Sequence, residues 1–366
     1  MLLNKKQLFI RTDANTQIGS GHLMRCLALA QAWKKQGGKV TFISVCESES
    51  LRNRITDEGF ELVKIKEPYP DHADFETTLL TINNSSLNNS WVVLDGYKFD
   101  TDYQQRIKNN GNRLLVIDDT AHLNHYFADI ILNQNIIAES LSYSCEPETK
   151  FLLGTDYVLL RDEFLVYKNW KRDIPEIAKK IIVTMGGGDS NNMTLRVLCA
   201  LDRVNIDGLE IKAVIGSNYL YLDTLKKVVK NSKHEIELLR NVSNIADLMT
   251  WADTAISAAG STCWELAYFG LPAILIVTST NQIMNLELLD KHGAATFVNN
   301  RINISAKKIS RKIYQLILHK NLRNKMSHTG KLLVDGKGRE RVVKTFQTLK
   351  SKGKEKNERE NIAVNL

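Results

Sequence analysis

Short apolar runs recur along the first half of the chain, and helical patterns lie between several of them. Such runs, bounded by polar loops, predict strands at Leu8–Arg11, Val40–Val45, Glu61–Ile65, Trp91–Asp95, Leu114–Asp118 and Ile130–Asn133. Leu23–Lys35 has helical periodicity and stops at Gly37-Gly38, as expected of glycine at a helix C-terminus. Alternating strands and helices indicate a parallel, doubly wound sheet.

A second alternating series begins after a polar stretch that contains a proline. It predicts strands at Ile181–Met185, Ile211–Ile215, Ile236–Leu239, Thr254–Ser257 and Ala273–Val277, and helices from about Ser305 to Lys350. We therefore expect an α/β protein with two Rossmann-like domains, residues 1–169 and 179–350, joined by a linker at 170–178. Their parallel sheets would face each other across a cleft, where ligands of open α/β sheets bind. The charge-rich residues 351–366 are expected to form a disordered tail.

Composition and charge narrow the class of protein. With 43% hydrophobic and 25% charged residues, the 366-residue chain is typical of soluble globular proteins. No apolar run approaches the ~20 residues that span a bilayer, and no secretion signal is evident, so we expect a cytoplasmic protein without membrane insertion. The net charge of +8 lies mostly after Arg301, but no nucleic-acid-binding motif accompanies it. We expect a solvated surface and no nucleic-acid partner.

The first candidate for chemistry is the loop after the first strand, which contains Gly19, Gly21 and His22. Glycines allow a ligand to approach the backbone, and N–H groups at a helix start favour an anion. The positive end of the helix also favours a neutral, proton-accepting imidazole. His22 is therefore predicted to act as a general base beside an anion. The alternative is a helix cap or a packing residue.

A second glycine loop, Thr184–Asn191, also follows a strand and precedes a helix. Its N–H groups, including that of Gly187, could cradle a phosphate. A second interpretation, compatible with the first, is a tight turn with Asp189 or Ser190 as the helix cap. The loop lacks a Gly-Lys-[Ser/Thr] ending, which excludes an ordinary P-loop kinase or ATPase site.

A third loop, Ser257–Glu265, combines small residues with hydroxyls at the start of a helix. A diphosphate could approach there, and Glu265, one turn into the helix, could accept two hydrogen bonds from a ribose diol. The alternative is a capping box formed by Thr262 and Glu265. Two amides at the head of a later helix could bind a sugar or a phosphate. The expected ligands in this half are Gly260, Ser261, Thr262, Glu265, Asn281 and Gln282.

Metal and cofactor chemistry find little support. His122-x-x-His125, with Asp118-Asp119 before it, is too loose a pattern for a metal site. The five cysteines are scattered and never spaced as Cys-x-x-Cys, which predicts neither a disulfide framework nor a structural zinc. The first loop matches only two glycines of a dinucleotide fingerprint and has Met24 in place of the third. We therefore expect no metal and no cofactor.

Seven blocks, in order between about Phe9 and about Ala295, resemble the UDP-sugar hydrolase family of pseudaminic acid biosynthesis. They are Ile10–Ala14, Ile18–Leu27, Val116–Asp119, Ile131–Asn135, Leu153–Arg161, Val183–Asp189 and Ala259–Leu266. The run Glu265–Pro272, with Asn281-Gln282 and Gly293–Ala295, also resembles the UDP-sugar site of the glycosyltransferase that adds N-acetylglucosamine to the murein lipid precursor. Both families share the GT-B architecture.

The resemblance implies hydrolysis of UDP-2,4-diacetamido-2,4,6-trideoxy-β-L-altropyranose to UDP and the free sugar. His22 corresponds to the hydrolase family's proposed base, and Glu265 to the helix glutamate that binds the uridine ribose in the murein glycosyltransferase. Asp13, in the first block, is an expected substrate contact. Gly96 departs from the family, in which histidine is frequent, so a second histidine contact and the sugar selectivity stay open. We expect a monomer or a weak oligomer. The alternatives are a glycosyltransferase that uses a UDP-amino sugar and a UDP-sugar-binding protein without catalysis.

Overall fold

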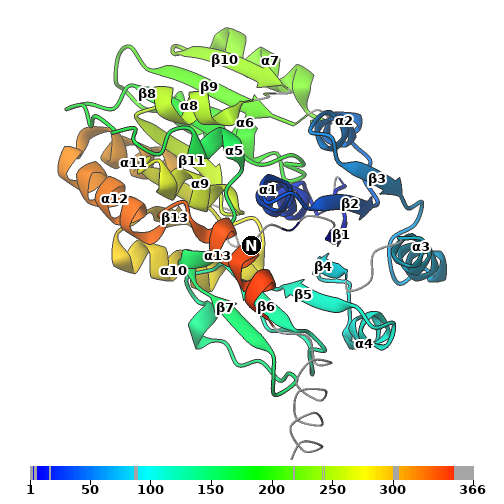
Figure 1. The fold of residues 1–366 in the computed structure, drawn as a ribbon. Helices are drawn as coiled ribbons and strands as arrows, with labels where there is room; N and C mark the ends of the chain where they lie inside the picture. The colour runs from blue at the N-terminus through cyan, green and yellow to red at the C-terminus, as the bar shows by residue number, and fades with distance from the viewer. Residues whose placement is uncertain are drawn as a thin grey trace, which may run out of the picture.

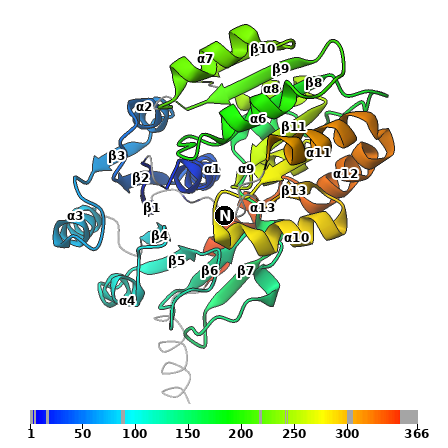
Figure 2. The ribbon, with the colours of Figure 1, turned by 180° about the vertical axis from the view of Figure 1, so that it is seen from behind.

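The chain folds into two domains, each built on a parallel sheet (Figures 1 and 2). The computed structural model describes residue 3 and residues 6–15, 18–85, 90–216, 219–240, 242, 244–299 and 305–349. The predicted tail at 351–366 lies outside the described residues. The α/β architecture with two Rossmann-like sheets is confirmed.

The N-terminal sheet has the strand order β3-β2-β1-β4-β5-β6-β7, and all of its pairings are parallel. Its strands are β1 (Gln7–Thr12), β2 (Lys39–Ser44), β3 (Glu61–Lys64), β4 (Trp91–Asp95), β5 (Arg113–Ile117), β6 (Ile130–Asn133) and β7 (Lys150–Leu153). The helices of this half are α1 (Gly21–Lys35), α2 (Glu49–Asp57), α3 (His72–Asn83), α4 (Thr101–Asn109), α5 (Asp162–Leu165) and the 3₁₀ turns η1 (Ala138–Ser140) and η2 (Thr155–Tyr157). The six predicted strands are confirmed, and β7 is an addition.

The C-terminal sheet repeats this design in the order β10-β9-β8-β11-β12-β13. Its strands are β8 (Lys180–Thr184), β9 (Glu210–Ile215), β10 (Glu235–Arg240), β11 (Thr254–Ala258), β12 (Ala273–Ile276) and β13 (Thr296–Val298). The helices are α6 (Met193–Leu201), α7 (Leu222–Asn231), α8 (Ile245–Trp251), α9 (Thr262–Tyr268), α10 (Ile283–His292), α11 (Ala306–Leu318), α12 (Lys320–Leu333), α13 (Gly338–Thr348) and the 3₁₀ turn η3 (Thr280–Gln282). The five predicted strands are confirmed, and the three-residue β13 is an addition.

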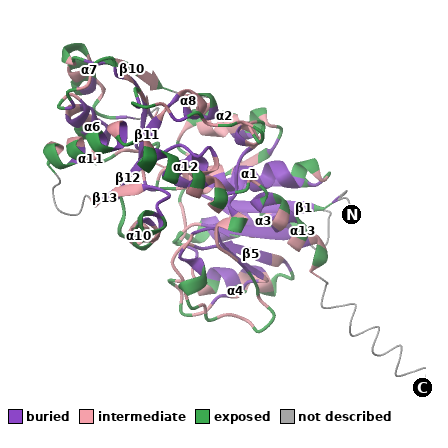
Figure 3. Ribbon diagram, turned by 90° about the vertical axis from the view of Figure 1, so that its left-hand side faces the viewer, coloured by how far each residue is buried: buried purple, intermediate pink, exposed green. Residues whose placement is uncertain are grey.

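The central strands are buried on both faces, which explains their continuous apolar runs in the sequence, whereas the edge strands β3 and β10 have no buried residue (Figure 3). In β1, Leu8 and Ile10 join one hydrophobic cluster, while Phe9 joins the cluster on the opposite face. In β8, Ile181 and Ile182 divide in the same way. Side chains alternate across a strand, so each run supplies two cores at once.

The last helix returns to the N-terminal domain (Figure 1). Phe346 of α13 packs edge-on against Trp33 of α1 and Trp91 of β4, with ring centroids 5.2 and 4.4 Å away. Gly338 lies so close to the backbone of Val158 that a Cβ there would come 2.3 Å from its carbonyl oxygen. The proposed division places α13 in the C-terminal domain, whereas its packing joins it to the N-terminal core.

The segment at the proposed linker, 170–178, is held by the C-terminal domain. Arg172 donates to the carbonyls of Met249 at 2.7 Å and Phe269 at 3.1 Å. From α12, Arg323 donates to the carbonyl of Glu176 at 2.9 Å. The chain therefore passes between the two cores before this segment, near Leu159, which belongs to an N-terminal cluster although its neighbours join the C-terminal one.

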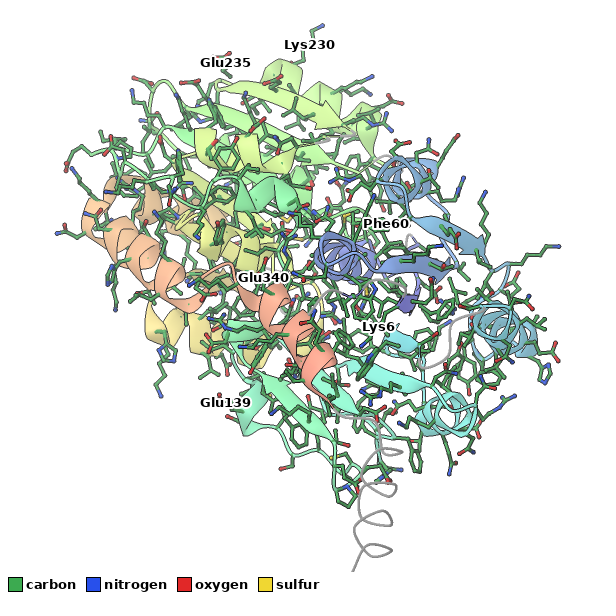
Figure 4. The ribbon with its side chains drawn as sticks, viewed as in Figure 1. Lys6, Phe60, Glu139, Lys230, Glu235 and Glu340 are labelled. Carbon is green, nitrogen blue, oxygen red and sulfur yellow. The ribbon has the colours of Figure 1, made fainter. Side chains whose placement is uncertain are left out.

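The outer surface is strongly charged. Lys230 of α7 and Glu235 of β10 project outward from the rim of the C-terminal domain (Figure 4). Among the described residues, no helix combines the length and the apolar character that a bilayer crossing requires.

Candidate active site

The strand order places a crevice in each sheet. It reverses between β1 and β4 in the N-terminal sheet and between β8 and β11 in the C-terminal sheet. Ligands of open parallel sheets bind outside the carboxyl ends of the strands at such a point. The loops after β1, β8 and β11 line a single cavity of about 1020 Å³ between the domains. This volume lies at the upper end of the range typical of small-molecule sites, ~300–1,000 Å³.

Ten of the eleven predicted site residues line this cavity. They are Gly19, Gly21, His22, Gly187, Gly260, Ser261, Thr262, Glu265, Asn281 and Gln282. The structure thus brings together four segments that are far apart in the sequence: the loops after β1, β8 and β11, and η3 after β12.

Asp13 is the exception, and its expected role as a substrate contact is corrected here. Its carboxylate accepts hydrogen bonds from the backbone N–H of Val45, at 2.8 Å, and from Nη2 of Arg11, at 3.1 Å. Arg11 is fully buried and also pairs with Asp74. Asp13, directly after β1, therefore pairs with Arg11 inside the domain and is not among the residues that line the cavity.

Glycines let the two domains meet at the cavity rim. A Cβ at Gly21 would lie 3.3 Å from Oγ of Ser261, and one at Gly187 would lie 3.4 Å from Oγ of Ser20. Both glycine loops therefore take part in the close approach of the domains; an added side chain would make a tight contact at Gly21 and an ordinary van der Waals contact at Gly187.

His22, the second residue of α1, faces the carboxyl end of β4. Its Nδ1 lies 2.6 Å from Oδ1 of Asp95, the last residue of that strand. Burial would raise the pKa of the Asp95 carboxyl, but Arg25 and His22 outweigh it and the pKa is lowered. An ionised carboxylate only accepts hydrogen bonds, so Nδ1 of His22 donates. Nε2 is then the nitrogen free to accept a proton.

Arg25 holds the same carboxylate of Asp95, and its Nη2 lies 3.1 Å from Nδ1 of His22. Its Nε donates to Oδ2 at 2.7 Å, and its Nη2 donates to Oδ1 at 2.6 Å. The same guanidinium also donates to Asp119 at 2.8 and 3.0 Å. His22 and Arg25, three residues apart on a helix, lie on the same face. Together they form a buried network that fixes the imidazole ring.

Tyr97 connects this network to the C-terminal domain. Its hydroxyl donates to Asp119 at 2.8 Å and accepts from Nδ2 of Asn281 at 3.0 Å. Its ring meets that of His22 edge-on, at 5.1 Å between centroids. The neighbouring Gly96 is close-packed, since a Cβ there would lie 3.1 Å from the ring of Phe99. That crowding opposes a histidine at this position.

Glu265 lies on the opposite wall of the cavity, in α9. The capping-box alternative is wrong, because Ser261 is the N-cap and no side chain caps this helix. The Glu265 carboxylate is buried, and burial raises its pKa against the opposing effect of Arg161. Nη1 of Arg161 lies 3.2 Å from Oε1. Among the described residues, no group other than Arg161 pairs with this carboxylate, so Oε2 keeps its acceptor capacity for a ligand.

Two other loop residues are engaged by the backbone. Asp189 accepts from the N–H groups of Met193 at 2.7 Å and Thr194 at 2.9 Å, so its carboxylate satisfies two N–H groups at the start of α6. Its carboxylate occupies the start of α6, where a phosphate would otherwise bind. Gln282 similarly uses its Oε1 to accept from the N–H of Thr278 at 2.9 Å.

His122 and His125, in the loop between β5 and β6, contact different carboxylates. His122 pairs with Asp118, at 3.0 Å between Nδ1 and Oδ2, whereas His125 contacts Glu146 at 3.0 Å. Within the part of the chain that the structure describes, no three His, Cys, Asp or Glu side chains gather as a metal site would need.

The fold and the interdomain cleft define a protein of the GT-B class. Residues 180–342 match the glycosyltransferase family 28 C-terminal domain. The structure of Acinetobacter baumannii MurG superimposes with a TM-score of 0.64 at 14% identity, over 94% of this chain and 100% of that one. A Staphylococcus aureus MnaA–UDP structure gives 0.63 at 12% identity, over 92% and 95%.

Curated relatives confirm the more particular resemblance. The Campylobacter jejuni UDP-2,4-diacetamido-2,4,6-trideoxy-β-L-altropyranose hydrolase is 29% identical over 70% of this chain and 85% of its own length. The Bacillus subtilis spore coat polysaccharide biosynthesis protein SpsG is 23% identical over 93% and 97%. An uncharacterized Methanocaldococcus jannaschii protein is 26% identical over 74% of this chain, a match that spans 55% of that protein.

Proposed function

We propose that the chain hydrolyses a UDP-sugar, with UDP-2,4-diacetamido-2,4,6-trideoxy-β-L-altropyranose as the substrate, in pseudaminic acid biosynthesis. The observation that carries the proposal is the His22–Asp95 pair, 2.6 Å apart, across the cavity from the Glu265 loop. A fixed imidazole with one free nitrogen suits a general base. The name of the Campylobacter relative supports the reaction and the sugar.

Water is the attacking group in this mechanism. Nε2 of His22 takes a proton from a water molecule, whose oxygen forms a bond to the anomeric carbon while the bond between that carbon and the UDP oxygen breaks. Asp95 stabilises the imidazolium that forms and keeps the ring in one tautomer. UDP then leaves with both electrons of the broken bond, and the proton passes on to solvent.

The C-terminal wall is assigned to UDP. Glu265 accepts hydrogen bonds from the ribose hydroxyls, and the loop Gly260–Thr262 receives the diphosphate. A Cβ at Gly260 would meet no atom within 4 Å, which leaves room for a ligand against the backbone. The start of α6 is a poorer phosphate site because the Asp189 carboxylate is already there. Donors placed where charge grows on the leaving group stabilise the transition state.

A glycosyltransferase is the second candidate, and the match of residues 180–342 to a glycosyltransferase domain favours it. The test is release of free UDP from UDP-diacetamido sugars in buffer without any acceptor, with each product resolved. A hydrolase releases UDP and free sugar at once, whereas a transferase needs an added acceptor. A binding protein without catalysis would release nothing.

Glu265→Gln is expected to weaken UDP binding roughly tenfold to a hundredfold, because hydrogen bonds to a charged group contribute ~1.5–3 kcal/mol. The wild-type affinity should also fall as pH drops toward the raised pKa of this carboxyl, because its ionised form accepts the ribose hydroxyls. Titration calorimetry with UDP measures both. Glu237→Gln, at an exposed surface pair with Lys212, is the control, and equal affinities in the two variants would contradict the assignment.

A disulfide between the domains should stop turnover reversibly. A Cβ at Gly187 would lie 3.9 Å from that of Ser20, within the usual range for a disulfide. We expect the oxidised Ser20→Cys/Gly187→Cys double variant to lose most of its turnover, since the substrate enters and UDP leaves between the domains. Reduction should restore it. Unchanged turnover in the fully oxidised protein would show that the cleft need not open there.

A further inference from the structure

A line of ion pairs runs from the cavity wall to the N-terminal domain. Nη1 of Arg161 lies 3.2 Å from Oε1 of Glu265, and Nε of Arg161 donates to Oε1 of Glu163 at 2.8 Å. Oε2 of Glu163 accepts in turn from Nη2 of Arg54, on α2, at 2.5 Å. Arg54, Arg161, Glu163 and Glu265 all line the cavity. The line therefore joins the two walls of the site.

Arg161 is itself firmly held. It is buried, its Nε is engaged by Glu163, and its guanidinium carbon lies 4.8 Å from the centre of the Phe164 ring. A guanidinium fixed in this way presents its remaining N–H groups in one plane and one direction. It can therefore set the orientation of any carboxylate that it meets.

Glu265 depends on that orientation. The cation beside its carboxylate is Arg161, which contacts Oε1. Its other charged neighbour, Glu163, carries the same sign and disfavours ionisation. A buried carboxylate without a cation tends to take up a proton and lose its power to accept two hydrogen bonds.

We propose that Arg161 is the positioning residue of the ribose subsite, holding the Glu265 carboxylate in place for the two ribose hydroxyls. The inference rests on the proposed function, in which Glu265 binds the ribose of UDP. Arg161 acts through Glu265, so its loss should matter only where the 2′-hydroxyl is read.

The test compares UDP with 2′-deoxy-UDP by titration calorimetry, in the wild type, Glu265→Gln, Arg161→Met and Arg161→Lys. We expect the wild type to bind UDP about ten- to a hundredfold more tightly than 2′-deoxy-UDP. Arg161→Met and Glu265→Gln should each reduce that ratio to near one. The double variant that combines both should lose no more affinity for UDP than the weaker-binding of the two single variants. In the Arg161→Met variant, KM for the UDP-sugar should rise, while kcat should change about twofold at most.

Arg161→Lys keeps the positive charge but lacks the planar guanidinium that contacts Glu163 and Glu265 through separate nitrogens, so its ratio should lie between those of the wild type and Arg161→Met. It also provides a folded variant if Arg161→Met does not fold. Arg196→Met, at an exposed arginine of α6, is the matched control and should keep the wild-type ratio.

Two results would overturn the inference while leaving the proposed function intact. In the first, Arg161→Met keeps the wild-type preference for UDP over 2′-deoxy-UDP while Glu265→Gln loses it. The other is an equal loss of affinity for both nucleotides, which would place Arg161 on the diphosphate. A wild type that shows no preference for UDP, or Glu265→Gln that keeps it, would instead overturn the Glu265 assignment and this inference with it.

Discussion

His22→Ala should lower the turnover of the UDP-sugar by ~10²–10⁴, the usual contribution of a general base. The affinity for UDP should stay within about twofold of wild type, because the nucleotide is assigned to the opposite wall. Steady-state release of UDP measures the first quantity, and titration calorimetry measures the second. Added imidazole should recover part of the lost rate if a missing base is the cause.

The control for this substitution is His72→Ala, in the same domain as His22. His72 is exposed and pairs loosely with Glu76, at 3.3 Å, so His72→Ala should keep full turnover. If His22→Ala instead lost UDP binding and turnover in parallel, His22 would be a ligand contact or a structural residue. The assignment of the base would then be wrong.

Asp95→Asn should be the most damaging single substitution in the chain. Removing one partner of a buried charge pair costs about 3–5 kcal/mol of folding stability, and here Arg25 keeps Asp119, which favours the lower end. Turnover should fall as well, by as much as ~10⁴, because an amide can donate to Nδ1 of His22 and stabilise the wrong tautomer. Thermal unfolding and UDP release at one temperature separate the two effects.

The stability loss has a defined pH dependence. The folded pKa of Asp95 is lowered, so its contribution is present above the unfolded value, about 3.9, and is lost as pH falls below that value. Wild type and Asp95→Asn should therefore differ most near neutral pH and converge in acid. Asp102→Asn, at an exposed pair with Arg106, should change stability by less than ~0.5 kcal/mol. A constant difference at every pH would contradict the charge-pair explanation.

The fold followed from local patterns wherever a strand is buried on both faces. The strands β4 and β6 match their predicted bounds because each is a continuous apolar run. The strand β7 was missed because its first two residues, Lys150 and Phe151, are exposed, and β13 was missed because it has only three residues. The return of α13 could not be predicted, since a helical pattern shows that one face is buried but not which sheet covers it.

The candidate site likewise contains residues that the sequence predicted and residues that it did not. His22 and Glu265 stood out because glycines and small residues surround them in the sequence. Asp95 did not, because an acidic residue at the end of a strand reads like the start of a loop until its burial is known. The spacing of His22 and Arg25, three residues apart on one helix face, was an available signal for a shared partner. The two-residue spacing of Arg11 and Asp13 was an available signal for an ion pair between them, which the structure shows.

The return of α13 makes the two domains interleaved, so neither can be exchanged at a single junction. A chimera that takes its nucleotide half from a relative needs two joints, one near Leu159 and one between α12 and α13. A chain cut after Leu333 would expose the apolar faces of Trp33 and Trp91 that Phe346 covers. Such a fragment should self-associate, as uncovered apolar patches do, and activity lost with it would say nothing about the catalytic residues.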